Sequence, residues 1–242
     1  MNSTPRVALV TGAGHRLGRA FAVALAARGE AVAVHYNAAG DEARKTVELI
    51  TASGGIASAF QTDLTRPDGA HSLVDAVVRD MGAIDILVNS AAVMERTPFG
   101  EVSITDWDRM FALNLRAPFF LAQAASKVMK PGSVIVNISD LAAFETWPAY
   151  VPHSISKAGV VRMTESLARV LAPAIRVNAI APGAVLLPEE CDEEQERKLA
   201  ETTPLKRIGH PSDAVGALLY LLDATYVTGQ TIVVDGGRRI RK

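Results

Sequence analysis

The chain has 242 residues and a formal net charge of -1, from 25 basic and 26 acidic side chains, and it contains a single cysteine, Cys191. The near-neutral charge offers no basic surface for nucleic-acid phosphates, so we expect no nucleic-acid partner. One cysteine excludes a disulfide framework and a thiolate metal cluster, and we expect no bound metal. The sequence has neither an export signal nor an apolar run of about eighteen residues, so we expect a cytoplasmic protein with no membrane partner.

Short apolar runs alternate with longer segments of helical period along the whole chain. This pattern predicts strands at 6–11, 31–35, 56–60, 84–88, 133–138, 175–179 and 231–234. It predicts helices at 17–28, 41–53, 67–81, 104–129, 152–171 and 212–222. Apolar strands joined by helical crossovers indicate an α/β fold, a doubly wound parallel sheet with helices on both faces. No linker or repeat divides the chain, so we expect one domain over residues 1–242.

One segment, 184–203, does not fit this alternation. Six acidic residues lie between Glu189 and Glu196, after a stretch rich in proline and glycine. One interpretation is a solvated helix with acids in its first turn, where the helix dipole favours them. The other is a mobile lid over a substrate cleft.

A glycine-rich stretch, Thr11-Gly-Ala-Gly-His-Arg-Leu-Gly18, joins the first predicted strand to the first predicted helix. In a doubly wound sheet this turn presents a helix N-terminus to a pyrophosphate, and glycine lets the backbone approach closely. Glycines also serve ordinary turns, but the position between strand and helix indicates a dinucleotide cofactor.

The second predicted strand ends at His35, Tyr36 and Asn37. A carboxylate at this point would hold the ribose 2′-hydroxyl of NAD. Because no acid stands there, and because His15 and Arg16 lie in the glycine turn, we expect a 2′-phosphate to be accommodated and NADP to be the cofactor. The alternative is that His15 and Arg16 are simply exposed turn residues.

Several motifs follow one another in a set order. They are Thr11-Gly12 with Gly18, Asp63-Leu64, Asn-Ser-Ala-Ala at 89–92, Asn114, Asn-Ile-Ser-Asp at 137–140, Lys157, Pro182-Gly183, and Val-Thr-Gly-Gln at 227–230. With this combination the chain resembles a short-chain dehydrogenase/reductase over nearly its whole length.

The resemblance implies a seven-stranded Rossmann sheet, NADPH as hydride donor, a small-molecule substrate and commonly a homotetramer built on helix pairs. It places Asn114 at a helix kink and in a water relay. It also implies a set of cofactor-binding positions: Gly12, Leu17, Gly18, Asp63, Leu64, Asn89, Ser90, Ala91, Lys157, Pro182, Gly183 and Val185.

Arg16, Asp140 and the stretch 185–189 resemble the pteridine reductase branch of that family. In this branch Val93 and Met94 stand where substrate contacts are expected, and Leu186 lies in the matching stretch. A thioether covers a planar ring less specifically than an aromatic side chain does, and filling a hydrophobic gap is the commoner role of Met. Trp147 lies between Asp140 and His153 and is a further candidate for the edge of the substrate cleft.

The largest departure from the family is at its catalytic Tyr-x-x-x-Lys pair, which here reads His153-Ser-Ile-Ser-Lys157. The spacing from Asp140 matches the family, so the tyrosine is absent from its place. A neutral imidazole does not usefully release its remaining N–H proton, so His153 can act as an acid only when protonated. Lys157 disfavours that form and Asp140 favours it.

Three functions remain open at this stage. The first is an NADPH-dependent reductase of a C=O or C=N bond in which Asp140, His153 and Lys157 are catalytic, with a pterin as leading substrate. The second is a 3-oxoacyl or general carbonyl reductase. The third is an NADP-binding scaffold or sensor whose catalysis is weak or lost because the tyrosine is replaced.

Overall fold

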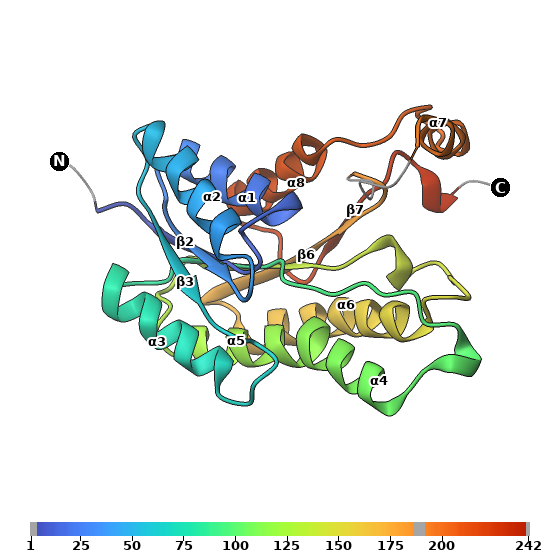
Figure 1. Ribbon diagram of the computed structural model, residues 1–242. Helices are drawn as coiled ribbons and strands as arrows, with labels where there is room; N and C mark the ends of the chain where they lie inside the picture. Colours follow the sequence, from blue (N-terminus) through green and yellow to red (C-terminus); the bar gives the residue numbers. More distant parts are fainter. Residues whose placement is uncertain (1–3, 186–191, 241–242) are drawn as a thin grey trace.

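Seven parallel strands form one twisted sheet in the order β3-β2-β1-β4-β5-β6-β7 (Figure 1). The computed structural model describes residues 4–185 and 192–240. The strands are β1 (Val7–Val10), β2 (Ala31–Tyr36), β3 (Ala57–Gln61), β4 (Ile86–Asn89), β5 (Ser133–Ile138), β6 (Ile175–Pro182) and β7 (Thr231–Val234). The predicted seven-stranded doubly wound sheet is confirmed.

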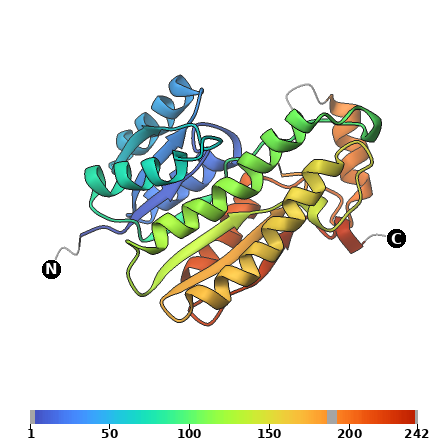
Figure 2. The same ribbon diagram turned by 90° about the horizontal axis from the view of Figure 1, so that it is seen from below.

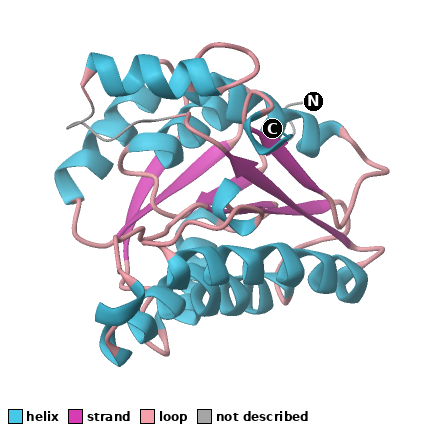
Figure 3. Ribbon diagram, turned by 90° about the vertical axis from the view of Figure 1, so that its right-hand side faces the viewer, coloured by secondary structure: helices cyan, strands magenta, loops and turns pink. Residues whose placement is uncertain are grey.

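Helices cover both faces of the sheet (Figures 1 and 3). On one face lie α1 (Arg16–Ala27), α2 (Gly40–Ala52) and α8 (Pro211–Asp223). On the other, seen in Figure 2, lie α3 (Gly69–Met81), α5 (Ala117–Ser126) and α6 (Val151–Leu171). Beyond the sheet are α4 (Ile104–Phe111), α7 (Glu193–Thr202) and the short helices η1 (Phe99–Glu101), η3 (Leu141–Ala143) and η4 (Arg238–Ile240). None of the helices within the described ranges has the length and apolar character to cross a bilayer.

The core is split into two layers by the central strands. Val7 and Leu9 of β1 face α3, α5 and α6, whereas Ala8 and Val10 face α1, α2 and α8. Successive side chains of a strand point to opposite faces, so a strand buried on both sides must be apolar throughout. This explains why the strands appear in the sequence as short continuous apolar runs.

The segment predicted as one helix over 104–129 is interrupted. A π-helical turn, η2 (Ala112–Arg116), separates α4 from α5, and it contains buried Asn114. Pro118 has no N–H to donate to the carbonyl of Asn114, so the regular hydrogen-bond ladder fails at this point. The kink implied at Asn114 is therefore present.

The acidic segment is a helix where the structure describes it. Asp192 and Gln195 form a capping box at the start of α7, and Glu193, Glu194 and Glu196 occupy its first turn. No residue of α7 is buried, as expected for a solvated helix. Residues 186–191, which include Leu186 and most of the pteridine reductase-like stretch, lie outside the described residues, and the lid over 184–203 stays a prediction.

A buried polar ladder joins β4, β5 and α6 near the carboxyl ends of the strands. The Asn89 side-chain amide donates to Asn137 Oδ1 at 2.8 Å, and the Asn137 amide donates to Thr164 Oγ1 at 2.9 Å. Asn137 and Thr164 are fully buried. Partners left unpaired inside a protein destabilise it by about 1–3 kcal/mol each, so the ladder fixes the register of α6 against the sheet.

We therefore expect Asn137→Ala to lower the free energy of unfolding by about 2–4 kcal/mol, because it removes two hydrogen bonds and leaves both partners buried. Urea denaturation of the variant and wild type measures this difference. A change below about 0.5 kcal/mol, the usual size for surface substitutions, would contradict the structural role of the ladder.

Candidate active site

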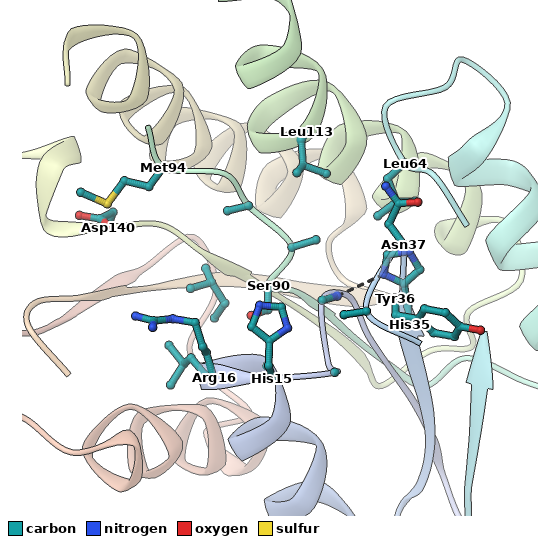
Figure 4. Close-up of a pocket in the computed structure, with 18 of the residues that line it drawn as sticks. His15, Arg16, His35, Tyr36, Asn37, Leu64, Ser90, Met94, Leu113 and Asp140 are labelled. Carbon is teal, nitrogen blue, oxygen red and sulfur yellow. Dashed lines mark hydrogen bonds between the residues drawn. The ribbon is translucent and has the colours of Figure 1, made fainter. Parts of the chain in front are cut away.

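A cavity of about 480 Å³ opens at the carboxyl ends of the strands, across β1 and β4 (Figure 4). These two strands are neighbours in the sheet, and the chain continues in opposite directions from them, to β2 and β3 on one side and to β5, β6 and β7 on the other. Ligands of doubly wound sheets bind at such a switch point. The loops after β1, β2, β3, β4, β5 and β6 all contribute to its lining.

The glycine turn after β1 leaves no room for side chains at two of its positions. Gly12 has a positive φ of 64°, and a Cβ there would stand 3.0 Å from the Cα of Ala91. A Cβ on Gly18 would stand 2.2 Å from the carbonyl oxygen of Gly12. Only glycine permits this close approach of the turn, the β4 loop and the start of α1, and the resulting cradle fits a pyrophosphate.

Buried Thr46 and partly exposed Arg19 hold the outer side of this turn. Thr46 Oγ1 lies 3.2 Å from the carbonyl oxygens of both Ala13 and Gly14, and its hydroxyl can donate a hydrogen bond to either. Arg19 Nε donates to the Gly14 carbonyl at 3.0 Å and is paired with Glu42. These contacts draw the carbonyl groups toward α2, away from the cavity.

Thr11 connects the same turn to the loop after β4. Its buried hydroxyl oxygen accepts hydrogen bonds from the backbone N–H groups of Ser90 and Ala91, at 2.9 and 3.0 Å. The glycine turn and the 90–92 loop therefore form one rigid wall of the cavity.

The end of β2 carries no acidic side chain where it lines the cavity. Tyr36, Asn37, Ala38 and Ala39 form this rim, and α2 begins directly afterwards with no side-chain cap. His35 is buried and hydrogen-bonded through both ring nitrogens. Burial lowers the pKa of His35 to about 4, so the ring is neutral near neutral pH and supplies no positive charge to a phosphate.

Arg16 adopts a left-handed backbone conformation, with φ of 51°. Such a conformation costs a residue other than glycine about 1 kcal/mol or more, and it is often found at functional sites. In Figure 4 the Arg16 side chain extends away from Tyr36 and Asn37, toward the end of the cavity that holds Met94 and Asp140. The contact between Arg16 and a 2′-phosphate stays a prediction.

Asp140, His153 and Lys157 meet at one end of the cavity. His153 Nε2 lies 3.5 Å from Asp140 Oδ2, an ion-pair distance, and forms no hydrogen bond with any described residue. The His153 side chain is only 2% exposed, whereas the Asp140 side chain is 24% exposed. Asp140 Oδ1 accepts from the backbone N–H of Ala142, which fixes the carboxylate at the start of η3. Both residues line the cavity, and Asp140 has the more exposed side chain of the two.

The protonation of His153 is constrained at its other nitrogen. Nδ1 lies 3.3 Å from the carbonyl oxygen of Val93, a group that can only accept, so Nδ1 carries a proton. In the neutral ring, Nε2 then presents a lone pair to the Asp140 carboxylate, which is repulsive. A hydrogen bond between Nε2 and the Asp140 carboxylate therefore needs one proton more than the neutral ring and the carboxylate hold together.

Lys157 is buried on α6 and donates to the carbonyl oxygen of Ile138 at 2.9 Å. Its burial lowers the pKa of the ammonium group to about 8, and the nearby Asp140 charge opposes that shift. Ser139 Oγ donates to the backbone carbonyl of Lys157 at 3.0 Å, which ties α6 to the end of β5.

Asn114 influences the site through its hydrogen bonds to the backbone of Val93. Its side-chain oxygen accepts from Val93 N at 2.8 Å, and its amide donates to Val93 O at 2.9 Å and to Ser156 Oγ at 3.1 Å. Val93 O is the oxygen that faces His153 Nδ1. Asn114 therefore positions the peptide that orients the imidazole and does not itself line the cavity.

Most predicted site residues are brought together in the cavity. They are Gly12, His15, Arg16, Leu17, Gly18, His35, Tyr36, Asn37, Asp63, Leu64, Ser90, Ala91, Met94, Asp140, His153, Lys157, Pro182, Gly183 and Val185. Sequence reasoning missed Gly14, Ala38, Ala39, Thr65, Ala92, Leu113, Ile138 and Ser139. Most of these are neighbours of predicted residues, so proximity in sequence was the available signal. For Leu113, the only signal in the sequence was its position next to Asn114.

Four predicted residues with described positions lie outside the cavity lining: Asn89, Val93, Asn114 and Trp147. Asn89 belongs to the buried ladder with Asn137, and Val93 and Asn114 meet through their backbone and amide groups. Trp147 Nε1 donates to Glu145, and its ring packs edge to face on Tyr150 with centroids 6.1 Å apart. Tyr150 is the residue before the first turn of α6 and does not line the cavity.

The chain was compared with known proteins. A family model described as enoyl-(acyl carrier protein) reductase matches residues 12–239. A 3-oxoacyl-[acyl-carrier-protein] reductase of Synechocystis is 35% identical over 240 residues, which is 97% of each chain. This chain belongs to the short-chain dehydrogenase/reductase family. It is therefore an oxidoreductase by descent, as the sequence predicted.

Solved structures of short-chain dehydrogenase/reductases superpose closely. FolM alternative dihydrofolate reductase 1 from Brucella canis, complexed with NADP, has a TM-score of 0.93 and 33% identity, with 99% of this chain and 96% of that chain covered. The angucycline C-6 ketoreductase LanV with bound NADP has a TM-score of 0.91 and 32% identity, with 97% and 96% covered.

We expect Lys157→Met to raise the free energy of unfolding at neutral pH while it weakens NADPH binding. The folded-state pKa of about 8 is below the ordinary 10.5, so the unfolded state holds the proton more tightly. Stability of the wild type therefore rises with pH between 8 and 10.5, and the variant lacks this dependence. The stability gain is expected to be on the order of 1 kcal/mol near pH 7 and to shrink by pH 10.

Urea denaturation at both pH values, together with NADPH titration, measures these effects. The exposed Lys127→Met is the matched control and is expected to change neither stability nor binding. A Lys157→Met variant that binds NADPH like the wild type would contradict the assigned position of Lys157.

Proposed function

We propose that this protein is an NADPH-dependent reductase of a C=O or C=N bond in a small substrate. The observation that carries the proposal is the Asp140–His153 pair, 3.5 Å apart beside buried Lys157, at one end of a cavity that fits a dinucleotide. When bound, NADPH supplies the hydride, and the protein must then supply one proton to the oxygen or nitrogen of the reduced bond.

The residues that would hold the cofactor follow from the walls of the cavity. The glycine turn at Gly12 and Gly18 cradles the pyrophosphate, and the uncharged rim at Tyr36 and Asn37 leaves space for a 2′-phosphate. We assign Lys157 to the ribose hydroxyls, because its ammonium group lies at the cavity wall beside Asp140. The prediction of NADP as cofactor is confirmed by similar structures, which hold NADP or NADPH.

The Asp140–His153 pair takes the place of the family's tyrosine in handling the proton. His153 holds one proton at Nδ1 toward Val93, and we propose that a second proton, taken up between Nε2 and Asp140, is the one delivered to the substrate. Asp140 has the more exposed side chain, so the second proton leaves through its carboxyl group toward the substrate and is replaced from solvent. The positive charge of Lys157 stabilises the carboxylate that remains.

Met94 supports a planar substrate, with a pterin as the leading candidate. Its thioether is 50% exposed and lies on the cavity wall near Asp140 (Figure 4). Arg16 and Asp140, the residues shared with the pteridine reductase branch, face this same end. The similar proteins include an alternative dihydrofolate reductase and a ketoreductase, so planar ketones are the second substrate class to test.

We also propose that the protein is a homotetramer in the cytoplasm. The outer surface of α4, α5 and α6 exposes Trp107, Phe119, Phe120 and Ile155, an apolar face that suits a second copy of the chain. A single cysteine is consistent with a reducing compartment.

Light scattering is expected to give about four times the chain mass of 25.7 kDa for the wild type, and Phe120→Glu is expected to form a smaller assembly. A monomeric wild type would contradict the tetramer.

Removal of either member of the proton pair is expected to reduce turnover more than cofactor binding. We expect His153→Ala and Asp140→Asn to lower kcat about 10²- to 10⁴-fold, the usual contribution of a positioned acid, with NADPH Kd changed less than about threefold. Wild-type kcat should rise as the pH falls, because the pair must hold its second proton. The Asp140→Asn profile should be flatter.

The exposed His71→Ala is the matched control and is expected to behave as the wild type. His153→Tyr decides between two accounts. A loss of activity in this variant supports His153 as the working residue, whereas a large gain would show that the wild-type protein is a binding scaffold with decayed catalysis.

A further inference from the structure

His35 joins two loops that line the cavity from opposite sides. It stands near the end of β2 and is 3% exposed. Its Nδ1 accepts a hydrogen bond from the backbone N–H of Gly12 at 3.1 Å, and its Nε2 lies 2.9 Å from the carbonyl oxygen of Thr62. Gly12 begins the glycine turn, and Thr62 directly precedes Asp63, which lines the cavity.

These two partners allow only one form of the ring. A backbone N–H can only donate, so Nδ1 must be unprotonated, and a carbonyl oxygen can only accept, so Nε2 must carry the proton. Burial holds the ring neutral at ordinary pH. His35 is therefore an acceptor toward the glycine turn and a donor toward the loop after β3 at the same time.

The two contacts set the distance between these loops. The backbone N–H of Gly12 donates to His35. It therefore fixes the conformation of the glycine turn and is not free to bind a pyrophosphate. On the other side, Asp63 Oδ1 accepts from the backbone N–H and the hydroxyl of Thr65, so the 62–65 loop is internally ordered once Thr62 is held. Both Gly12 and the 63–65 stretch line the cavity.

We propose that His35 is a positioning residue for the cofactor, which raises NADP affinity by holding the glycine turn and the 62–65 loop at the spacing that the dinucleotide needs. A binding site held in its bound shape loses less entropy when the ligand enters, so affinity increases without any additional contact to the ligand. The inference rests on the NADP binding of the proposed function and is independent of turnover.

Three substitutions separate the two hydrogen bonds. His35→Asn keeps an acceptor near the position of Nδ1, His35→Gln keeps a donor near the position of Nε2, and His35→Phe keeps the ring volume with neither. We expect NADPH Kd to rise at least about tenfold in His35→Phe and by smaller factors in the other two. The Asn and Gln variants retain part of the ring's hydrogen bonding and test the proposal even if the Phe variant does not fold.

The matched control is Thr164→Val, which removes buried hydrogen bonds of the same kind outside the cavity. Calorimetric NADPH titration without substrate and thermal unfolding of the free protein are measured for all four variants. The proposal expects Thr164→Val to lower Tm with Kd changed less than about twofold. Wild-type Kd in all three His35 variants overturns the proposal. A second result also overturns it. If Thr164→Val and His35→Phe lower Tm equally and weaken NADPH binding equally, the loss of affinity reflects general destabilisation.

Discussion

Loops at the carboxyl edge of a parallel sheet carry backbone groups that no neighbouring strand can pair, and the site depends on how these groups are satisfied. Unpaired backbone groups are rare inside proteins, so buried side chains must supply the missing hydrogen bonds. Here Thr11 holds the β4 loop, His35 holds the glycine turn and the β3 loop, and Asn114 holds Val93. The cavity is therefore shaped by side chains that face away from the ligand.

The same network determines the electrostatics of the reacting end. Asn114 fixes Val93, and Val93 O fixes which nitrogen of His153 faces Asp140. Lys157 is held in the interior by Ile138 O, where its charge is costly for stability and useful beside a carboxylate. Natural proteins often accept lower stability at such sites in return for function. At the reacting end, buried His153 and partly exposed Asp140 lie 3.5 Å apart.

The sequence was sufficient to predict the sheet, its helices and most of the cavity lining, because apolar strands and glycine turns leave periodic and local signals. The interruption at Ala112–Arg116 was not visible as a boundary, since the apolar pattern continues through it. Its signs were Pro118 and the kink that the family resemblance implies at Asn114. The direction in which each side chain points at the end of a strand was less predictable. Asn89 and Ser90 are adjacent, yet Asn89 points into the ladder with Asn137 while Ser90 lines the cavity.

Roles that depend on a partner distant in sequence could not be predicted. His35 was expected beside the 2′-phosphate, but its partners Gly12 and Thr62 make it a structural link. Trp147 was a candidate for the cleft edge or for packing, and its contacts with Tyr150 and Glu145 show the packing. Side-chain direction in loops is set by tertiary contacts, and no spacing rule along the chain encodes it.

We propose that this chain turns over NADPH, with Asp140 and His153 handling the proton. The most direct test is NADPH oxidation by the wild-type protein with a panel of dihydropterins, biopterin and planar ketones, at about pH 6 and pH 9. We predict measurable turnover with at least one class, faster at the lower pH, where Lys157, whose pKa burial lowers to about 8, is charged. Tight NADPH binding without oxidation of NADPH at either pH would contradict it.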